Sequence, residues 1–310
     1  MSVIFLARTR GMCAGVARAI AVVERALDKF GARRVYVLHE VVHNRHVVED
    51  LRGRGAKFVE SLSEIPEGSV VIFSAHGVGL ETVKEANARG FTVIDATCPL
   101  VARIHRKMNA AGEAGKAAVV IGHAGHQEVT GTIGQYTGSP SLVHVVLTPQ
   151  DVEQLSINEK NIIFATQTTL SVDETAATVA ALKAKFPQIE GPRRDDTCYA
   201  TQLRQRAIKE LSALCDVILV AGSPNSSNSN RLREVAESGG KKAYLIDDAS
   251  YIDLKWLEGA EKIGLSAGAS APEYVVDGII AFLKEHGVTE LKLVGEENRH
   301  AVFPLPKGLE

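Results

Sequence analysis

Short apolar runs rich in β-branched residues alternate along the chain with longer stretches in which apolar residues recur at helical spacing. The short runs are typical of strands buried in a parallel sheet, and the longer stretches are typical of amphipathic helices. The alternation therefore predicts an α/β fold throughout. Helical stretches include 15–30 and 169–186. The candidate strands are 3–6, 35–38, 70–73, 91–94, 118–121, 161–164, 216–220, 242–246, 262–265 and 291–294.

One order of elements occurs three times. Each repeat runs Cys, helix, strand with a polar loop, helix, and strand with a second polar loop, and the repeats begin at Cys13, Cys98 and Cys198. The first polar loops start at positions 39, 123 and 223, and the second at 74, 166 and 266, so the offsets nearly agree. Ligands of parallel α/β sheets bind at the carboxyl ends of strands, so three such repeats could share one central site. The alternative is the ordinary alternation of any α/β protein.

The repeats predict three similar α/β lobes in a pseudo-threefold arrangement. We expect the first lobe over 1–97, with the N-terminal strand joining the third lobe, and the second over 98–194. The third lobe is expected over 195–285, followed by a C-terminal strand and tail over 286–310.

Composition narrows the classes of function. Charged residues make up 23% of the chain and the formal net charge is −2, which gives no electrostatic basis for nucleic acid as a partner. No apolar run approaches the roughly 20 residues of a membrane span, and the N-terminus lacks a secretory signal. The four Cys are too widely spaced for a disulfide framework, which predicts a reducing, cytoplasmic location.

Three of the four cysteines lie in turns that lead into helices. Cys13, Cys98 and Cys198 stand in RGMCAG, DATCPL and DDTCYA, where backbone N–H groups can stabilise a thiolate. Three thiolates from separate repeats suit an iron–sulfur cluster better than a zinc finger, which would show CxxC pairs. Three protein ligands would leave one iron open to substrate. Cys215 lies in apolar LSALCDVILV and is expected to be a core residue.

The polar loops carry groups suited to an anion. His43, His76 and His126 each end such a loop, and imidazole donates hydrogen bonds to phosphate. The third repeat has no such His. It has the run 225–230, which consists only of Ser and Asn at an expected helix start, and then Ser270. These residues supply uncharged hydrogen-bond donors. A flexible polar loop is the alternative for that run.

Two further groups near these loops remain open to two interpretations. Glu128 could donate a proton if it is desolvated, or it could be an exposed loop residue. Thr168 and Thr169 can belong to a site loop, to a helix N-cap, or to both.

One motif points elsewhere. Residues 39–43, HEVVH, match the HExxH pattern of zinc peptidases, which requires a helix. The five residues directly follow an expected strand and include two Val, so a zinc peptidase is only the alternative enzyme. Walker-type and GxGxxG loops are absent from the sequence, which gives no support for ATP or NAD(P) chemistry.

Taken together, the motifs resemble one family. RGMCAGVARAI, HEVVHNRHVV, FSAHGV, DATCPLV, IGHAGHQEVTGT, TQTTLSVDET, DDTCYAT, GSPNSSNSNRL and SAGASAP strongly resemble the 4-hydroxy-3-methylbut-2-enyl diphosphate reductases (LytB), from about residue 3 to 305. These enzymes catalyse the last step of the non-mevalonate (MEP) isoprenoid pathway. Gln127 departs from the family, which usually has Pro between this His and Glu.

The resemblance implies a cluster and a set of site residues. It implies three lobes around a central [4Fe–4S] cluster that has three Cys ligands and one open iron site. The ligands would be Cys13, Cys98 and Cys198. The catalytic groups would be Glu128, which starts the proton relay, Thr168 and His126. The residues that contact the diphosphate substrate would be His43, His76, His126, Thr168, Thr169, Ser226, Ser227, Asn228 and Ser270.

The expected reaction is a reductive dehydroxylation that consumes two electrons and two protons and gives isopentenyl and dimethylallyl diphosphate. Since no nicotinamide site is visible, flavodoxin or ferredoxin is the expected electron donor. A non-catalytic iron–sulfur sensor is the rival from another class, and it would need no diphosphate pocket.

Overall fold

A computed structural model describes residues 2–158, 160–192, 196–296 and 301–310. The chain forms two compact units. The first unit comprises residues 1–17, 42–50 and 199–302, and the second comprises 18–41, 51–198 and 303–310. Within the described ranges, no helix is both long enough and apolar enough to cross a membrane.

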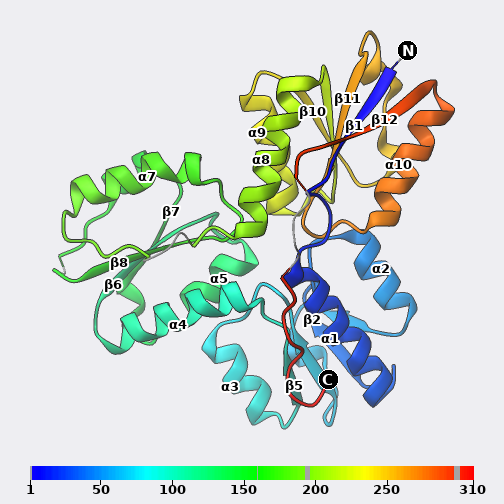
Figure 1. The fold of residues 1–310 in the computed structure, drawn as a ribbon. Helices are drawn as coiled ribbons and strands as arrows, with labels where there is room; N and C mark the ends of the chain where they lie inside the picture. Colours follow the sequence, from blue (N-terminus) through cyan, green and yellow to red (C-terminus); the bar gives the residue numbers. More distant parts are fainter. Residues whose placement is uncertain (1, 159, 193–195, 297–300) are drawn as a thin grey trace. The chain divides into compact units, whose positions relative to one another are not determined.

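The first unit contains a five-stranded parallel sheet in the order β10-β9-β11-β1-β12 (Figure 1). The N-terminal strand β1 lies between β11 and β12, with Ile4 opposite Ile263 and Leu291. The strands are β1 (Ser2–Ala7), β9 (Val217–Ala221), β10 (Lys242–Ile246), β11 (Lys262–Ala267) and β12 (Val288–Val294). The helices of this unit are α8 (Tyr199–Leu214), α9 (Ser227–Ser238) and α10 (Glu273–Glu285).

Helices cover both faces of this sheet. On one face, Ile208 and Leu211 of α8 and Leu232 of α9 pack with Ile218 and Val220. On the other, α10 packs through residues such as Val276 and Ile279. Strands covered on both sides read as continuous apolar runs, which explains why sequence pattern alone locates them.

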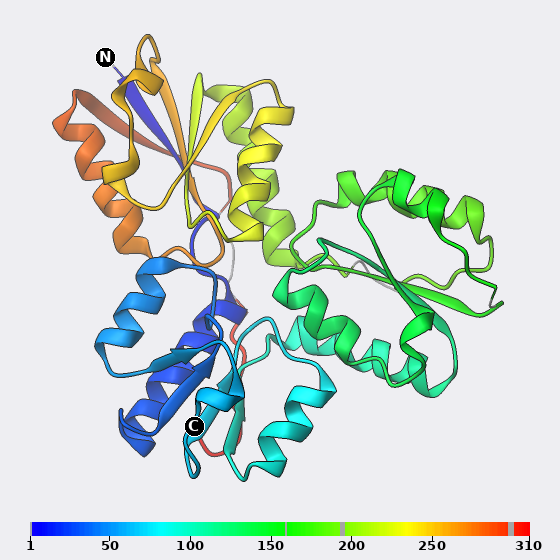
Figure 2. The same ribbon diagram turned by 180° about the vertical axis from the view of Figure 1, so that it is seen from behind.

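The second unit holds two smaller parallel sheets, visible from behind in Figure 2. One has the order β3-β2-β4-β5, and its strands are β2 (Val35–Leu38), β3 (Lys57–Val59), β4 (Val70–Phe73) and β5 (Thr92–Asp95). Its helices are α1 (Ala14–Phe30), α2 (Arg45–Gly53) and α3 (Leu80–Ala88), of which α1 and α2 begin in residues assigned to the first unit.

The other sheet of the second unit has the order β7-β6-β8. Val119 and Ile121 of its central strand face the core that includes Leu182, while Val120 faces the core that includes Met108, because side chains alternate along a strand. Its strands are β6 (Ala117–Ile121), β7 (Val143–Val146) and β8 (Ile162–Thr166). Its helices are α4 (Pro99–Glu113), α5 (Gln127–Gly134), α6 (Pro149–Gln154) and α7 (Val172–Lys185).

Three parallel sheets flanked by helices confirm the predicted α/β class and match the three expected lobes in number. The exact lobe boundaries stay a prediction, and the one expected at 194–195 lies outside the described residues.

Candidate functional site

The three cysteines that begin the sequence repeats, Cys13, Cys98 and Cys198, lie in equivalent positions. Each is a half-buried cysteine outside any disulfide and immediately precedes a helix. Each donates its backbone N–H to a carbonyl oxygen of a second polar loop. The donor–acceptor pairs are Cys13 and Ala269 (3.0 Å), Cys98 and Ala75 (3.0 Å), and Cys198 and Thr168 (2.9 Å). The sequence repeat is therefore also a repeat of backbone geometry.

Cys215 differs from these three, as its apolar context predicts. It is 1% exposed, and burial raises the pKa of its thiol to about 12. A protonated, enclosed thiol is a poor metal ligand.

The donor chemistry of Cys13, Cys98 and Cys198 fits an iron–sulfur cluster, because all three are accessible thiols at the start of a helix. Cys13 belongs to the first unit and the other two to the second. Among the described residues, no three His, Cys, Asp or Glu side chains are grouped so as to hold a metal ion. Shared ligation of one cluster by the three thiols stays a prediction.

Glu128 is buried, not an exposed loop residue. It is 2% exposed, and its carboxylate accepts hydrogen bonds from the Thr168 N–H at 2.6 Å and the Thr168 hydroxyl at 2.9 Å. Its own N–H donates to Nδ1 of His126 at 3.1 Å, which makes His126 the N-cap of α5. Since Nδ1 accepts this bond, the neutral imidazole of His126 carries its proton on Nε2.

His76 lies next to His126, and their ring centroids are 5.9 Å apart in an edge-to-face arrangement. Backbone contact between the loop after β4 and helix α5 brings them together. A Cβ added at Gly131 would lie 2.9 Å from the Gly77 carbonyl oxygen, and one added at Gly134 would lie 2.8 Å from the Gly79 Cα. Side chains are thus excluded from the α5 side of the contact.

His105 of α4 lies beneath the same loop. It is 7% exposed, and a Cβ added at Gly77 would lie 2.3 Å from its Cε1. Burial lowers the pKa of His105 to about 4, with the Asp95 charge acting weakly in the opposite direction. The ring is therefore neutral at physiological pH.

Gln167 and Asn44 are site-loop residues that the sequence patterns did not single out. Gln167 is 2% exposed; its side-chain oxygen accepts from the His123 N–H at 3.0 Å, and its Nε2 donates to the Thr169 hydroxyl at 2.9 Å. Asn44 is 1% exposed and accepts from the Val47 N–H at 3.1 Å. An Asn directly before a helical stretch is a recognisable N-cap signal, whereas nothing local distinguishes Gln167 from its neighbours.

In the first unit, the polar run 225–230 comprises the end of a turn, the N-cap and the first residues of helix α9, and is not a flexible loop. Ser226 is the N-cap and accepts from the Ser229 N–H at 3.3 Å, and the half-buried Ser227 begins the helix. The Asn228 side chain is buried and its Oδ1 accepts from the Ala269 N–H at 2.8 Å. Within the described part of the chain, Nδ2 of Asn228 has no hydrogen-bond partner.

The first unit also joins Ser270 to His43. Ser270 is 5% exposed, and its hydroxyl donates to the His43 carbonyl oxygen at 2.9 Å. The first unit therefore brings together His43, Ser226, Asn228 and Ser270, and the second unit brings together His76, His126, Glu128 and Thr168.

The HExxH pattern is not helical. Residues 39–44 form the loop between β2 and α2, and His39 has a φ of 61°. Nδ1 of His39 contacts the Glu60 carboxylate at 2.7 Å. The geometry that a zinc peptidase requires is absent from this stretch.

Comparison with known proteins decides the family. The family model described as LytB protein matches residues 4–284. The chain belongs to the LytB family. Relatives named 4-hydroxy-3-methylbut-2-enyl diphosphate reductase include a protein of Methylococcus capsulatus, 56% identical over 99% of this chain and 98% of its own length. One of Aeromonas salmonicida is 55% identical with the same coverage.

Two solved structures share the fold of this LytB chain. The E-1-hydroxy-2-methyl-but-2-enyl-4-diphosphate reductase of Plasmodium falciparum superposes with a TM-score of 0.94 at 34% identity, covering 99% of this chain and 96% of that one. A second structure, described as the terminal enzyme of the non-mevalonate pathway, gives a TM-score of 0.65 at 29% identity, covering 92% of this chain and 100% of the other.

Proposed function

We propose that this LytB protein is a 4-hydroxy-3-methylbut-2-enyl diphosphate reductase that forms isopentenyl and dimethylallyl diphosphate with release of water. The observation that carries the proposal is the equivalent placement of three cysteines outside any disulfide, each of which donates its N–H to a carbonyl oxygen of a second polar loop. The relatives that are more than half identical over nearly the whole chain support the choice of substrate.

Cys13, Cys98 and Cys198 would hold a [4Fe–4S] cluster with one iron free of protein ligands. When bound, the cluster would pass on two electrons, received one at a time from an external donor, and would offer a Lewis-acidic iron to the allylic oxygen. A one-electron donor of the flavodoxin or ferredoxin type fits this chemistry, and a reducing cytoplasm would keep the thiols available.

The diphosphate would be bound by neutral or singly protonated donors. His126 offers its Nε2–H, because Nδ1 is occupied as the cap of α5. Asn228 offers a buried amide N–H that has no protein partner among the described residues. His43, His76, Thr169, Ser226, Ser227 and Ser270 would complete the set. Uncharged donors hold a diphosphate without the desolvation cost of several buried cations.

Glu128 and Thr168 would handle the proton that converts the leaving hydroxyl to water. Thr168 fixes both carboxylate oxygens of Glu128, one through its N–H and one through its hydroxyl. Such a carboxyl is preorganised, so its proton can be delivered to the substrate oxygen without rearrangement of the loop. Gln127 stands at the start of α5 and leaves the His126 cap intact.

The decisive test is anaerobic purification followed by iron and sulfide analysis and turnover with the diphosphate substrate. We expect about four irons per chain and formation of both products. Cys98→Ser should abolish cluster binding, while Cys215→Ser, the matched control, should retain it. A colourless wild-type protein, or equal iron loss in the two variants, would refute the assignment.

A further inference from the structure

The segment 42–50 is assigned by its contacts to the first unit, although the residues on either side of it belong to the second. It carries His43 and the beginning of α2. The hydrogen bond from the Ser270 hydroxyl to the His43 carbonyl fixes one point of this segment. A single neutral hydrogen bond contributes only about 1 kcal/mol, so other contacts must hold the segment in place.

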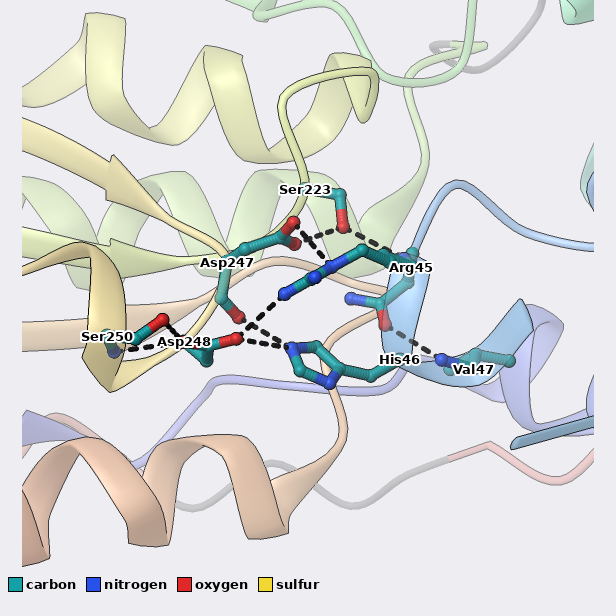
Figure 3. Close-up of polar contacts among 8 residues, drawn as sticks. Arg45, His46, Val47, Ser223, Asp247, Asp248 and Ser250 are labelled. Atoms are coloured by element: carbon teal, nitrogen blue, oxygen red, sulfur yellow. Dashed lines mark hydrogen bonds and ion pairs between the residues drawn. The ribbon is translucent and has the colours of Figure 1, made fainter. Parts of the chain in front are cut away.

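Arg45 supplies a charged connection to the loop after β10 (Figure 3). Its Nε lies 3.2 Å from one Asp247 carboxylate oxygen, and its Nη2 lies 2.8 Å from an Asp248 carboxylate oxygen. A planar guanidinium that engages two carboxylates fixes direction as well as distance. The Asp247 side chain is only 8% exposed, and Arg45 and Ser223 provide its ionic and hydrogen-bonding partners.

Ser223 links the same carboxylate to the backbone of the segment. Its hydroxyl accepts from the Arg45 N–H at 3.0 Å and donates to Asp247 at 2.5 Å. Ser223 also begins the turn that ends at the helix cap, because the Ser226 N–H donates to its carbonyl at 3.0 Å. One buried hydroxyl thus joins the segment of His43 to the turn of Ser226.

His46 makes a second contact with the acidic pair. Its Nε2 lies 3.2 Å from the Asp247 carbonyl oxygen and 3.3 Å from the Asp248 carboxylate, and its ring stands edge-on to Tyr274. Partial burial raises the pKa of Asp248, but the Ser250 hydrogen bonds and the His46 and Arg45 charges outweigh it and lower that pKa below its usual value. Asp248 is therefore anionic at neutral pH.

We propose that Arg45, Ser223, Asp247 and Asp248 form a positioning network that holds His43 beside the Ser226–Asn228 turn and Ser270, so that these donors are preset for the diphosphate. The inference rests on the proposed function. None of the four network residues is assigned to the reacting atoms. Their loss should weaken binding of the diphosphate group while the chemical step is preserved.

Arg54 provides a matched control. Like Arg45, it has a side chain that is 41% exposed and an ion pair with an acidic residue, in this case Glu24. That pair lies in the second unit and involves none of the proposed site residues. Arg45→Gln and Arg54→Gln therefore remove the same charge from equally exposed positions.

The experiment measures binding of inorganic diphosphate by calorimetry, together with KM and kcat of the cluster-loaded enzyme. Arg45→Gln should raise both the Kd for diphosphate and KM roughly five- to tenfold with kcat within about twofold, and Arg54→Gln should change neither. Asp247→Asn, which keeps the shape of the side chain, should reproduce the effect if Arg45→Gln does not fold.

Three outcomes would overturn the network. They are an unchanged diphosphate Kd in folded Arg45→Gln, equal weakening of diphosphate binding by Arg54→Gln, and a fall in kcat without a change in KM. Absence of turnover in the wild-type enzyme would instead count against the proposed function, because calorimetric binding of diphosphate does not depend on turnover.

Discussion

Helices α5 and α9 begin in the same way but present different chemistry. The second residue of each helix is buried, Glu128 in α5 and Asn228 in α9, and each accepts a hydrogen bond from the backbone N–H of a second polar loop. The loop residues that donate these bonds, Thr168 and Ala269, also accept the N–H of a cysteine. One backbone arrangement thus holds an acid in the second unit and an uncharged amide in the first.

The repeated backbone arrangement thus determines where the second side chain of each helix lies. The residue type at that position determines what the side chain can do. A carboxyl at this position can move a proton, whereas an amide transfers none and can only donate its N–H to an anion. If this division of tasks is correct, substitutions at the two positions should separate kcat from KM.

The largest effect is expected for Glu128→Gln. The amide keeps the shape of the side chain but cannot transfer a proton, so kcat should fall by at least about 100-fold. KM should stay within about threefold of wild type, as steady-state kinetics with the diphosphate substrate would show. A defect confined to KM would move Glu128 from the acid role to a binding role and erase the contrast with Asn228.

A second contrast concerns the loss of stability in acid. We expect His105, in the second unit, to cause this loss. Its folded-state pKa of about 4 lies below the unfolded value of 6.5, so the unfolded chain binds more protons between these pH values. Stability is therefore complete above pH 6.5 and declines as the pH falls towards 4. His105 should account for about 2 kcal/mol lost between pH 7.5 and pH 5.

Urea unfolding of His105→Gln at the two pH values checks this expectation. The loss of unfolding free energy between the two pH values should be smaller by that amount in His105→Gln than in wild type. His286→Gln, at an exposed position of the first unit, should show the wild-type loss. An equal loss of unfolding free energy in wild type and His105→Gln would show that other groups cause the acid sensitivity.

The smallest of the three effects is expected for Asn228→Asp. Oδ1 can still accept from the Ala269 N–H, but the replaced amide group becomes a negative oxygen that repels the diphosphate. KM should rise roughly tenfold with kcat within about twofold. Asn87→Asp adds the same charge at an exposed position of α3 and should have no effect. A fall in kcat without a change in KM would assign Asn228 to the reaction instead.

Sequence pattern predicted the buried strands best. The ranges 35–38 and 70–73 agree with β2 and β4 to the residue, because these strands are buried along their whole length and uniformly apolar. The short edge strands β3 and β7 were not predicted, since a few residues at a sheet edge show no clear period. The helix expected over 169–186 begins at Val172, after the Ser171 N-cap.

The candidate site was predicted in its residue types more than in its contacts. The repeat located Cys13, Cys98 and Cys198 and the loops around them, because that signal recurs along the chain. The hydrogen bond between Thr168 and Glu128 joins residues far apart in sequence, so no local pattern reveals it. The same holds for Arg45 and Asp247, whose pairing depends on how the segment 42–50 packs in the first unit.

The glycine contact between helix α5 and the loop after β4 restricts what evolution can change near the two neighbouring histidines. At Gly131 and Gly134 even one methyl group would collide with main chain that has no flexible end to swing aside. From the other direction, a Cβ added at Gly79 would lie 3.1 Å from the Gly134 Cα, whereas one added at Gly77 would meet the buried His105 ring. Substitution of Gly79, Gly131 or Gly134 by any larger residue would therefore push the loop and α5 apart and separate His76 from His126.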